Sequence, residues 1–181
     1  MPEQKVYLSL GSNLGHRERN LYAAVACLRS QTLAAVRESC IYETEPQDVL
    51  EQPAFLNMVV CGITNVSPWH LLSSIGSCEK LLGRTRDNAV PKGPRTIDID
   101  ILLFGDVILH GPGLDIPHPR IVQRRFVLQP LLEIAPEICN PESGRTFRSY
   151  LTGPVLEQKV IFYKNCSRWP ENSGSVLLPL D

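Results

Sequence analysis

The sequence lacks the features that would place it in a membrane, in a zinc site or in a disulfide-stapled scaffold. None of its apolar runs approaches the length of a transmembrane helix, and its first residues lead directly into a strand-like pattern without a signal peptide. Its six cysteines include no Cys-x-x-Cys pair, so neither a zinc site nor a disulfide is indicated. We therefore expect a reduced, cytoplasmic protein with no membrane partner.

The chain also lacks an excess of charge of either sign. Its formal net charge is −1, which argues against a bulk electrostatic attraction for nucleic acid. With 181 residues, 43% of them hydrophobic and 20% charged, it has the composition of one soluble domain that buries its own core. Any anion must then be bound by a local basic cluster, and we expect a monomer that binds small molecules.

Hydrophobic periodicity predicts strands alternating with helices. Strands are predicted at 6–10, 32–44 and 55–64, around Asp98 and Asp100, and at 107–109; helices are predicted at 21–28, 68–82 and 121–132. Connections that run directly from strand to strand, mixed with helical crossovers, favour an α+β fold: a ferredoxin-like α/β/α sandwich with a mainly antiparallel sheet. We expect one domain over 1–160, with 161–181 as a loosely packed C-terminal extension.

Two aspartates stand in the middle of the apolar stretch GPRTIDIDILLFG. Asp98 and Asp100 are two positions apart, so a strand points both carboxylates to the same face. The simplest interpretation is a solvated strand face. Aspartate is depleted from strands, however, and Leu102 on the same face indicates that this face is not uniformly wet. The pair therefore predicts a function that needs two adjacent hard oxygen ligands.

A basic loop rich in glycine and proline lies just before this strand. It contains Arg84, Arg86, Lys92 and Arg95. Arginine binds phosphate oxygens through two parallel hydrogen bonds and lysine adds a point charge, although such a loop can also be a solvated surface. Magnesium takes one or two carboxylates together with phosphate oxygens. Carboxylates beside a basic loop thus predict a magnesium–polyphosphate site.

Seven stretches together resemble the 6-hydroxymethyl-7,8-dihydropterin pyrophosphokinases of folate biosynthesis. They are LGSNLG at Leu10–Gly15, IYETEP at Ile41–Pro46, QPAFLN at Gln52–Asn57, LGRTR at Leu82–Arg86, GPRTIDIDILLFG at Gly93–Gly105, IPHPR at Ile116–Arg120 and RRFVLQPLLEIAP at Arg124–Pro136. The resemblance implies an ATP-dependent diphosphotransferase that transfers the β,γ-pyrophosphate of ATP to the pterin hydroxymethyl group and releases AMP.

The resemblance also implies which residues bind the pterin. Phe55 and Phe126 match the two aromatic positions that sandwich the ring, and Asn57 matches the amide that reads its edge. Thr44 matches a segment whose backbone faces the pterin. The assignment is chemically sound because a flat polar heterocycle favours aromatic faces and an amide that offers both donor and acceptor. Phe55 on its own would be an ordinary core aromatic.

A second group of positions is implied to bind ATP and its metal. Asp98 and Asp100 match the ligands of two Mg²⁺ ions and, with Arg84 and Arg95, form the catalytic set. The ATP-binding positions implied by the resemblance are Glu79, Arg84, Arg86, Lys92, Arg95, His118 and Arg124. Glu79 also lies on the apolar face of its predicted helix, where an unpaired carboxylate would be costly, and this supports a functional role independently of the resemblance. His118, between two prolines, rests on the resemblance alone.

Two other functions share parts of this pattern. An RNA-recognition module also has a ferredoxin-like sheet with aromatics, but such modules carry a basic excess, and aspartates on the sheet would repel a phosphate backbone. A magnesium-dependent phosphohydrolase would use the same carboxylates but would leave Phe55, Asn57 and Phe126 unexplained. We therefore expect no nucleic-acid partner.

Overall fold

A six-stranded antiparallel sheet forms the centre of the computed structural model, which describes residues 2–47, 51–84 and 93–165. Its strands are β1 (Gln4–Ser12), β2 (Ala34–Glu38), β3 (Ile41–Thr44), β4 (Phe55–Thr64), β5 (Asp98–Phe104) and β8 (Val160–Lys164). The order across the sheet is β5-β1-β4-β3-β8, and β2 also pairs with β4. This arrangement confirms the expected α+β, ferredoxin-like fold.

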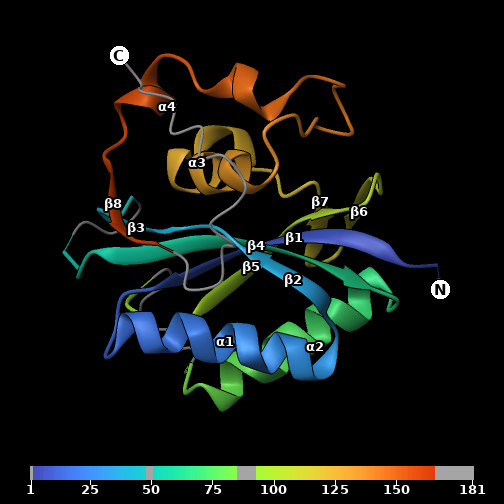
Figure 1. The fold of residues 1–181 in the computed structure, drawn as a ribbon, viewed down its shortest axis with the longest axis horizontal. Helices are drawn as coiled ribbons and strands as arrows, with labels where there is room; N and C mark the ends of the chain where they lie inside the picture. Colours follow the sequence, from blue (N-terminus) through green and yellow to red (C-terminus); the bar gives the residue numbers. More distant parts are fainter. Residues whose placement is uncertain (1, 48–50, 85–92, 166–181) are drawn as a thin grey trace.

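Helices cover both faces of the sheet (Figure 1). Helices α1 (Arg17–Gln31) and α2 (Pro68–Leu81) lie side by side on one face, and α3 (Arg125–Ile134), followed by the short η2 (Phe147–Tyr150) and α4 (Pro154–Glu157), lies on the other. Each face has its own apolar cluster: the first includes Leu8, Leu10 and Leu21, and the second includes Val59, Leu102 and Leu131. None of the helices among the described residues is long and apolar enough to cross a membrane.

The two long helices begin and end as their sequences predict. The α1 stripe of Leu21, Ala24, Val25 and Leu28 is buried. At the start of α2, the Ser67 hydroxyl accepts a hydrogen bond from the His70 N–H at 3.2 Å, directly before Pro68. After α2, Gly83 has a φ of 79°, a conformation that glycine adopts at little cost. Local capping chemistry was therefore sufficient to place this helix.

The segment predicted as one strand over 32–44 is two strands, β2 and β3. Both pair with β4, and the break falls at Ser39 and Cys40. Ser39 spans the break: its N–H donates to the Val59 carbonyl and its hydroxyl accepts from the Val59 N–H, each at 2.9 Å. Because serine replaces the lost backbone pairing, the sheet tolerates the interruption, and propensity alone could not reveal it.

Three other boundaries also differ from expectation. The strand predicted at 107–109 instead starts at Leu109. This strand, β6 (Leu109–Gly111), pairs with β7 (Leu114–Ile116) across a turn in which Gly113 has a φ of 81°. The third helix is preceded by a 3₁₀ turn, η1 (Ile121–Gln123), and runs to Ile134. Strand β1, predicted over 6–10, extends from Gln4 to Ser12.

The expectation that no disulfide is present was wrong. Cys27 of α1 and Cys78 of α2 form a disulfide, with 6.0 Å between their Cα atoms. Spacing could not reveal it, because the two residues are 51 positions apart and meet only when the helices pack together. Cys40, Cys61 and Cys139 are free thiols.

The chain beyond residue 158 joins the sheet. Strand β8 pairs antiparallel with β3, with Thr44 opposite Val160 and Glu43 opposite Ile161. Residues 161–164 therefore form part of the edge strand, although the sequence analysis placed them in a loosely packed extension. The division into a domain and an extension otherwise stays a prediction.

Candidate functional site

Three strands present the candidate site on the face of the sheet that α3 covers. Because side chains alternate along a strand, this face receives Gly11 from β1, Asn57 from β4 and Asp98 from β5. These three are direct neighbours across the strands, since Gly11 is in register with both Asn57 and Asp98. Further along, the same face turns apolar and packs under α3 with Val59 and other residues. The polar ends of these strands and the start of α3 therefore line an open cleft.

The cleft is open to solvent, and the empty space in it and at its mouth together amounts to about 600 Å³. Its walls come from five parts of the chain: the polar strand ends, the loop after β3, the residues before β4, the loop before β5, and the N-terminal end of α3. The lining residues are Ser9, Gly11, Thr44, Glu45, Pro46, Gln47, Gln52, Phe55, Asn57, Arg95, Asp98, Asp100, Arg124 and Phe126.

Asn57 is buried and held in one orientation. Only 4% of it is exposed, and its Nδ2 donates a hydrogen bond of 2.7 Å to Thr44 Oγ1. Its Oδ1 lies close to Gly11: a Cβ added at Gly11 would stand 3.0 Å from that oxygen and 3.7 Å from Cδ1 of Phe55. Gly11 therefore leaves the space between Asn57 and Asp98 free for a ligand.

Each of the two aromatic side chains of the cleft has an arginine beside it. The guanidinium of Arg95 lies 5.6 Å from the centre of the Phe55 ring, and that of Arg124 lies 5.5 Å from the centre of the Phe126 ring. Both distances are within cation–π range. The arginines also reach the aspartates, so each aromatic ring is connected through an arginine to the carboxylate pair.

Asp98 is held between two arginines. Its Oδ1 is 2.8 Å from Arg84 Nη1, and its Oδ2 accepts a hydrogen bond of 2.8 Å from Arg95 Nη1. Arg84 in turn pairs with Glu79, whose carboxylate is buried and accepts from the Ile99 N–H at 2.9 Å. Burial raises the pKa of Glu79 above its ordinary value, although Arg84 opposes the shift. Glu79 thereby ties Arg84 to the strand that carries both aspartates.

Asp100 has the more strongly perturbed carboxylate. Its side chain is 38% exposed, yet the surrounding protein raises its pKa to about 6, by desolvation first and then by the negative charge of Asp98. Arg124 Nη1, at 3.7 Å, opposes this shift. Two adjacent carboxylates of like charge repel each other and form a site that a cation would stabilise.

His118 faces Asp100 as a neutral imidazole. Burial and the nearby Arg124 and Arg120 lower its pKa to about 4. Its Nδ1 accepts a hydrogen bond of 3.1 Å from the Arg120 N–H, so the proton of the neutral ring lies on Nε2. That nitrogen is 3.8 Å from Asp100 Oδ2, and His118 therefore presents an uncharged N–H donor toward the carboxylate pair.

The structure brings most of the predicted residues into one region. Those that line the cleft are Thr44, Phe55, Asn57, Arg95, Asp98, Asp100, Arg124 and Phe126, while Arg84 and His118 lie close to the aspartates without lining the cleft. Glu79 contacts Arg84 and β5 and does not line the cleft. Arg86 and Lys92 lie outside the described residues.

The sequence analysis missed several lining residues. Gly11 was placed beyond the end of the first predicted strand, although a glycine within a strand pattern is itself a signal of close approach by a ligand or another chain. Ser9 and Gln47 also line the cleft, and no local pattern distinguishes them from ordinary polar residues.

The carboxylate pair fits Mg²⁺. Asp98 and Asp100 offer hard oxygen ligands on one face of one strand, inside a cleft lined also by arginines that suit phosphate. Arg95 adds a further sign of an anionic ligand, because its Nε is buried without a hydrogen-bond acceptor among residues 2–47, 51–84 and 93–165.

Comparison with known proteins identifies the family. Residues 7–136 match the family model described as 7,8-dihydro-6-hydroxymethylpterin-pyrophosphokinase (HPPK). The chain is similar to the 2-amino-4-hydroxy-6-hydroxymethyldihydropteridine pyrophosphokinase of Bacillus subtilis, at 45% identity over 73% of this chain and 78% of the relative. The Pseudomonas aeruginosa protein of the same name is 40% identical over 85% of this chain and 94% of the relative.

Longer proteins and solved structures contain a similar segment. The folic acid synthesis protein fol1 of Pneumocystis carinii is 40% identical over 81% of this chain, and the chain spans only 20% of that protein's length. A crystal structure of wild-type Plasmodium falciparum HPPK-DHPS with pteroate has a TM-score of 0.65 over 82% of this chain and 42% of that chain, and its 18% identity supports the fold alone. On the family match and the bacterial relatives together, this chain belongs to the 7,8-dihydro-6-hydroxymethylpterin-pyrophosphokinase family.

Proposed function

We propose that this chain transfers the β,γ-pyrophosphate of ATP to the hydroxymethyl oxygen of 6-hydroxymethyl-7,8-dihydropterin and releases AMP. One observation carries the proposal: a single cleft holds an aromatic and amide set suited to a pterin beside a carboxylate and arginine set suited to a metal-bound triphosphate. A phosphohydrolase would need only the second set, and the buried, fixed Asn57 would then have no role.

In this proposal the pterin lies between Phe55 and Phe126, with one edge against Asn57. The hydrogen bond from Asn57 to Thr44 orients the amide so that its Oδ1 is available as an acceptor next to Gly11. An amide held this way selects a heterocycle that offers an N–H at that edge, because a ligand without the donor would leave a buried acceptor unpaired.

Asp98 and Asp100 would hold two Mg²⁺ ions, and ATP would be the co-substrate. When bound, Mg²⁺ neutralises the triphosphate charge and lowers the pKa of the pterin hydroxyl. Arg84, Arg95 and Arg124, which contact these two carboxylates, would bind the phosphate oxygens. Arg86 and Lys92 are proposed to join them, and His118 and Glu79 to support the nucleotide side of the site.

The reaction is an in-line displacement at the β-phosphorus. The hydroxymethyl oxygen forms the new bond to phosphorus and loses its proton, while the bond from the β-phosphorus to the oxygen of the α-phosphate breaks and AMP leaves with that electron pair. The protein positions both substrates and places positive charge where negative charge develops, and these two effects account for most of the catalysis in phosphoryl transfer. Arg84 and Arg95 are the residues placed to supply that charge.

The remaining partner and compartment predictions are part of the proposal. We infer a monomer that binds small molecules and needs neither nucleic acid nor a membrane. The cytoplasmic localisation expected from the sequence stays a prediction. That prediction assumed reduced cysteines, and the disulfide between Cys27 and Cys78 argues against this assumption because disulfides persist mainly in oxidising compartments.

The direct test incubates the protein with ATP, Mg²⁺ and 6-hydroxymethyl-7,8-dihydropterin and separates AMP from ADP. AMP that forms only in the presence of the pterin, and is abolished by a chelator in excess of Mg²⁺, is the expected result. Release of ADP or phosphate without pterin dependence would instead indicate a hydrolase. Substitution of pteroate for the hydroxymethyl pterin is the matched control, since it lacks the accepting hydroxyl.

A further inference from the structure

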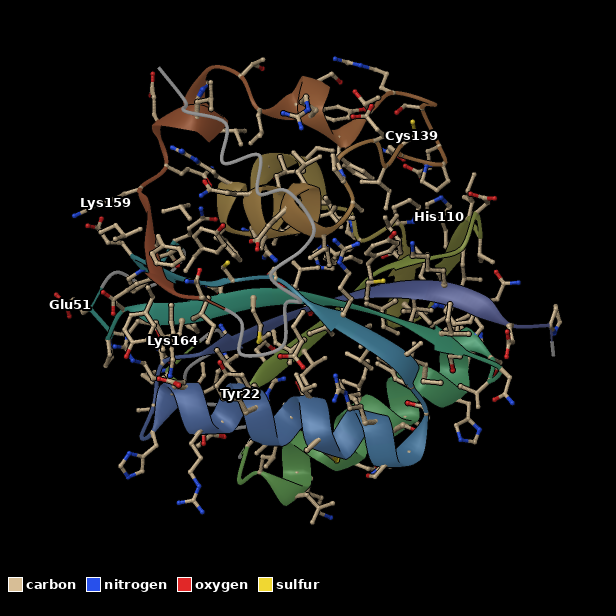
Figure 2. The ribbon with its side chains drawn as sticks, viewed as in Figure 1. Tyr22, Glu51, His110, Cys139, Lys159 and Lys164 are labelled. Carbon is tan, nitrogen blue, oxygen red and sulfur yellow. A yellow bond between two sulfur atoms is a disulfide. The ribbon has the colours of Figure 1, made fainter. Side chains whose placement is uncertain are left out.

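One glutamine joins two walls of the cleft from outside it. Gln158 lies between α4 and β8, where the chain descends from the layer of α3 to the edge of the sheet; Figure 2 shows the next residue, Lys159, at this position. Gln158 is half-buried and belongs to the part of the chain for which the family resemblance gave no role.

The side chain of Gln158 makes three hydrogen bonds of 2.8 Å to three different segments. Its Oε1 accepts from the backbone N–H of Arg125 and from Nε2 of Gln47, and its Nε2 donates to the carbonyl of Gln123. The amide thus uses both its acceptor and its donor, and it holds the loop after β3 and the start of α3 to the same point.

The bond to Arg125 caps α3. The first N–H groups of a helix have no partner within the helix, and the N-cap residue of α3, Arg124, provides no side-chain acceptor for them. Gln158 supplies that acceptor from outside the helix, at its first residue. The cap matters for the site because Arg124 and Phe126, on either side of Arg125, both line the cleft.

The other bond holds the opposite wall. Gln47 lines the cleft together with Glu45, and both lie in the loop that follows Thr44. The neighbours of Gln158 strengthen this connection: Lys159 Nζ is 3.2 Å from Glu45 Oε1, and Val160 pairs with Thr44 in the sheet. The Lys159 ion pair is exposed on both sides and contributes little, so the connection depends mainly on the Gln158–Gln47 hydrogen bond and on the pairing of Val160 with Thr44.

We propose that Gln158 is a positioning residue for the pterin half of the site. It holds the Phe126 end of α3 to the Thr44–Gln47 wall, in which Thr44 pairs with Phe55, and so helps to set the spacing between the two rings that receive the pterin. This inference rests on the proposed function, because it assigns the space between these rings to the pterin. It also makes the segment 158–160 a functional part of the enzyme.

Two variants of Gln158 separate this role from general stability. Gln158→Ala removes all three hydrogen bonds, and we expect the KM for the pterin to rise roughly tenfold while kcat and the KM for MgATP stay within about threefold. Gln158→Glu keeps both accepted bonds and places a negative charge at a helix N-terminus, where it is favourable. It should therefore restore a pterin KM within about threefold of that of the unmodified protein.

The matched control is Glu157→Ala, which truncates the exposed preceding residue and should leave both KM values unchanged. An unchanged pterin KM in Gln158→Ala would overturn the inference. Equal impairment of the Ala and Glu variants would also overturn it, and so would a parallel rise of both KM values with a lower unfolding temperature, which indicates general destabilisation.

Hydrogen exchange distinguishes failure of this inference from failure of the proposed function. The Arg125 amide should exchange faster in Gln158→Ala and at the normal rate in Gln158→Glu, with no substrate present. If the unmodified protein formed no AMP with the pterin, the proposed function and the pterin assignment would both fall, and the exchange rate alone would decide whether Gln158 caps α3. Unchanged exchange would refute that cap.

Discussion

Arg95 and Asp98 form an ion pair of 2.8 Å inside the candidate site. Arg84 contacts the other oxygen of the same carboxylate and also pairs with Glu79, so the two arginines share Asp98 as a common partner. A triphosphate with Mg²⁺ offers each group a new partner: the carboxylate takes the cation and the guanidinium groups take the phosphate oxygens. In the ion pair, the carboxylate proposed to bind the metal and the guanidinium groups proposed to bind phosphate therefore serve as partners for each other.

Replacement of Asp98 by alanine should abolish turnover and not pterin binding. We expect AMP formation to fall by about a thousandfold or more, because the variant lacks half of the proposed metal set. Pterin affinity, measured by calorimetry, should stay within about threefold, since Asn57 and the aromatic rings are untouched. Without Mg²⁺, the variant should bind ATP more tightly than the unmodified protein, because Arg95 has lost its carboxylate partner and Arg84 retains only Glu79.

Asp106→Ala is the control for this experiment, because Asp106 is an exposed aspartate in the turn after the same strand. Near-normal AMP formation by Asp98→Ala would refute the metal assignment. Weaker ATP binding in the absence of Mg²⁺ would refute the proposed exchange of partners by the arginines.

Gly11→Ala should weaken pterin binding through one added methyl group. The new Cβ would lie 3.0 Å from Oδ1 of Asn57, and Asn57 cannot easily move away because Thr44 holds its amide. We expect the dissociation constant for the pterin to rise roughly 10–100-fold and the free energy of unfolding to fall by about 1–3 kcal/mol.

Gly76 provides the matched glycine. A Cβ at Gly76, within α2, would meet no atom within 4 Å. Gly76→Ala should leave pterin affinity unchanged and stabilise the protein by up to about 1 kcal/mol, because alanine favours the helix. If Gly11→Ala also proved neutral for pterin affinity, the space between Asn57 and Asp98 would not be the pterin site.

Phe126→Ala should separate pterin binding from nucleotide binding. Loss of one stacked ring is expected to lower pterin affinity about 10–100-fold, while MgATP affinity stays within about threefold. Tyr163→Ala removes an exposed aromatic of β8 and should change neither affinity. Both constants can be measured by titration calorimetry; an equal loss of ATP affinity would show that the ring serves the nucleotide.

Reduction of the Cys27–Cys78 disulfide should lower stability without altering the chemistry. The bond closes a 51-residue separation, for which chain entropy predicts a loss of up to about 4 kcal/mol in the free energy of unfolding. The two helices it joins pack on the face of the sheet opposite the cleft (Figure 1), so AMP formation at 25 °C should persist. Urea unfolding with and without a dithiol reductant measures the effect.

The double variant Cys27→Ala/Cys78→Ala is the control, since reductant should no longer change its unfolding midpoint. Thiol titration of denatured protein should yield two additional thiols after reduction. No additional thiols, together with an unchanged midpoint, would show that the bond does not form in solution.

The sequence alone predicted the main helices and strands, because these depend on local patterns, and its motif matches proposed most of the site residues. Alternation placed Asp98 and Asp100 on one strand face, and Ser67 with Pro68 started a helix where its stripe begins. The motif matches assigned Phe55, Asn57 and Phe126 before any contact was known, and the structure places all three around one cleft.

Only the tertiary structure decided the relationships between distant segments. The disulfide, the arginines beside the aromatic rings, the Ser39 bridge between β2 and β3, and the return of β8 to the sheet all join residues whose approach depends on packing and not on neighbouring sequence. Gln158 illustrates the reason best: nothing around it marks it, and its role arises because α3 begins without its own side-chain cap and the chain passes close enough to provide one.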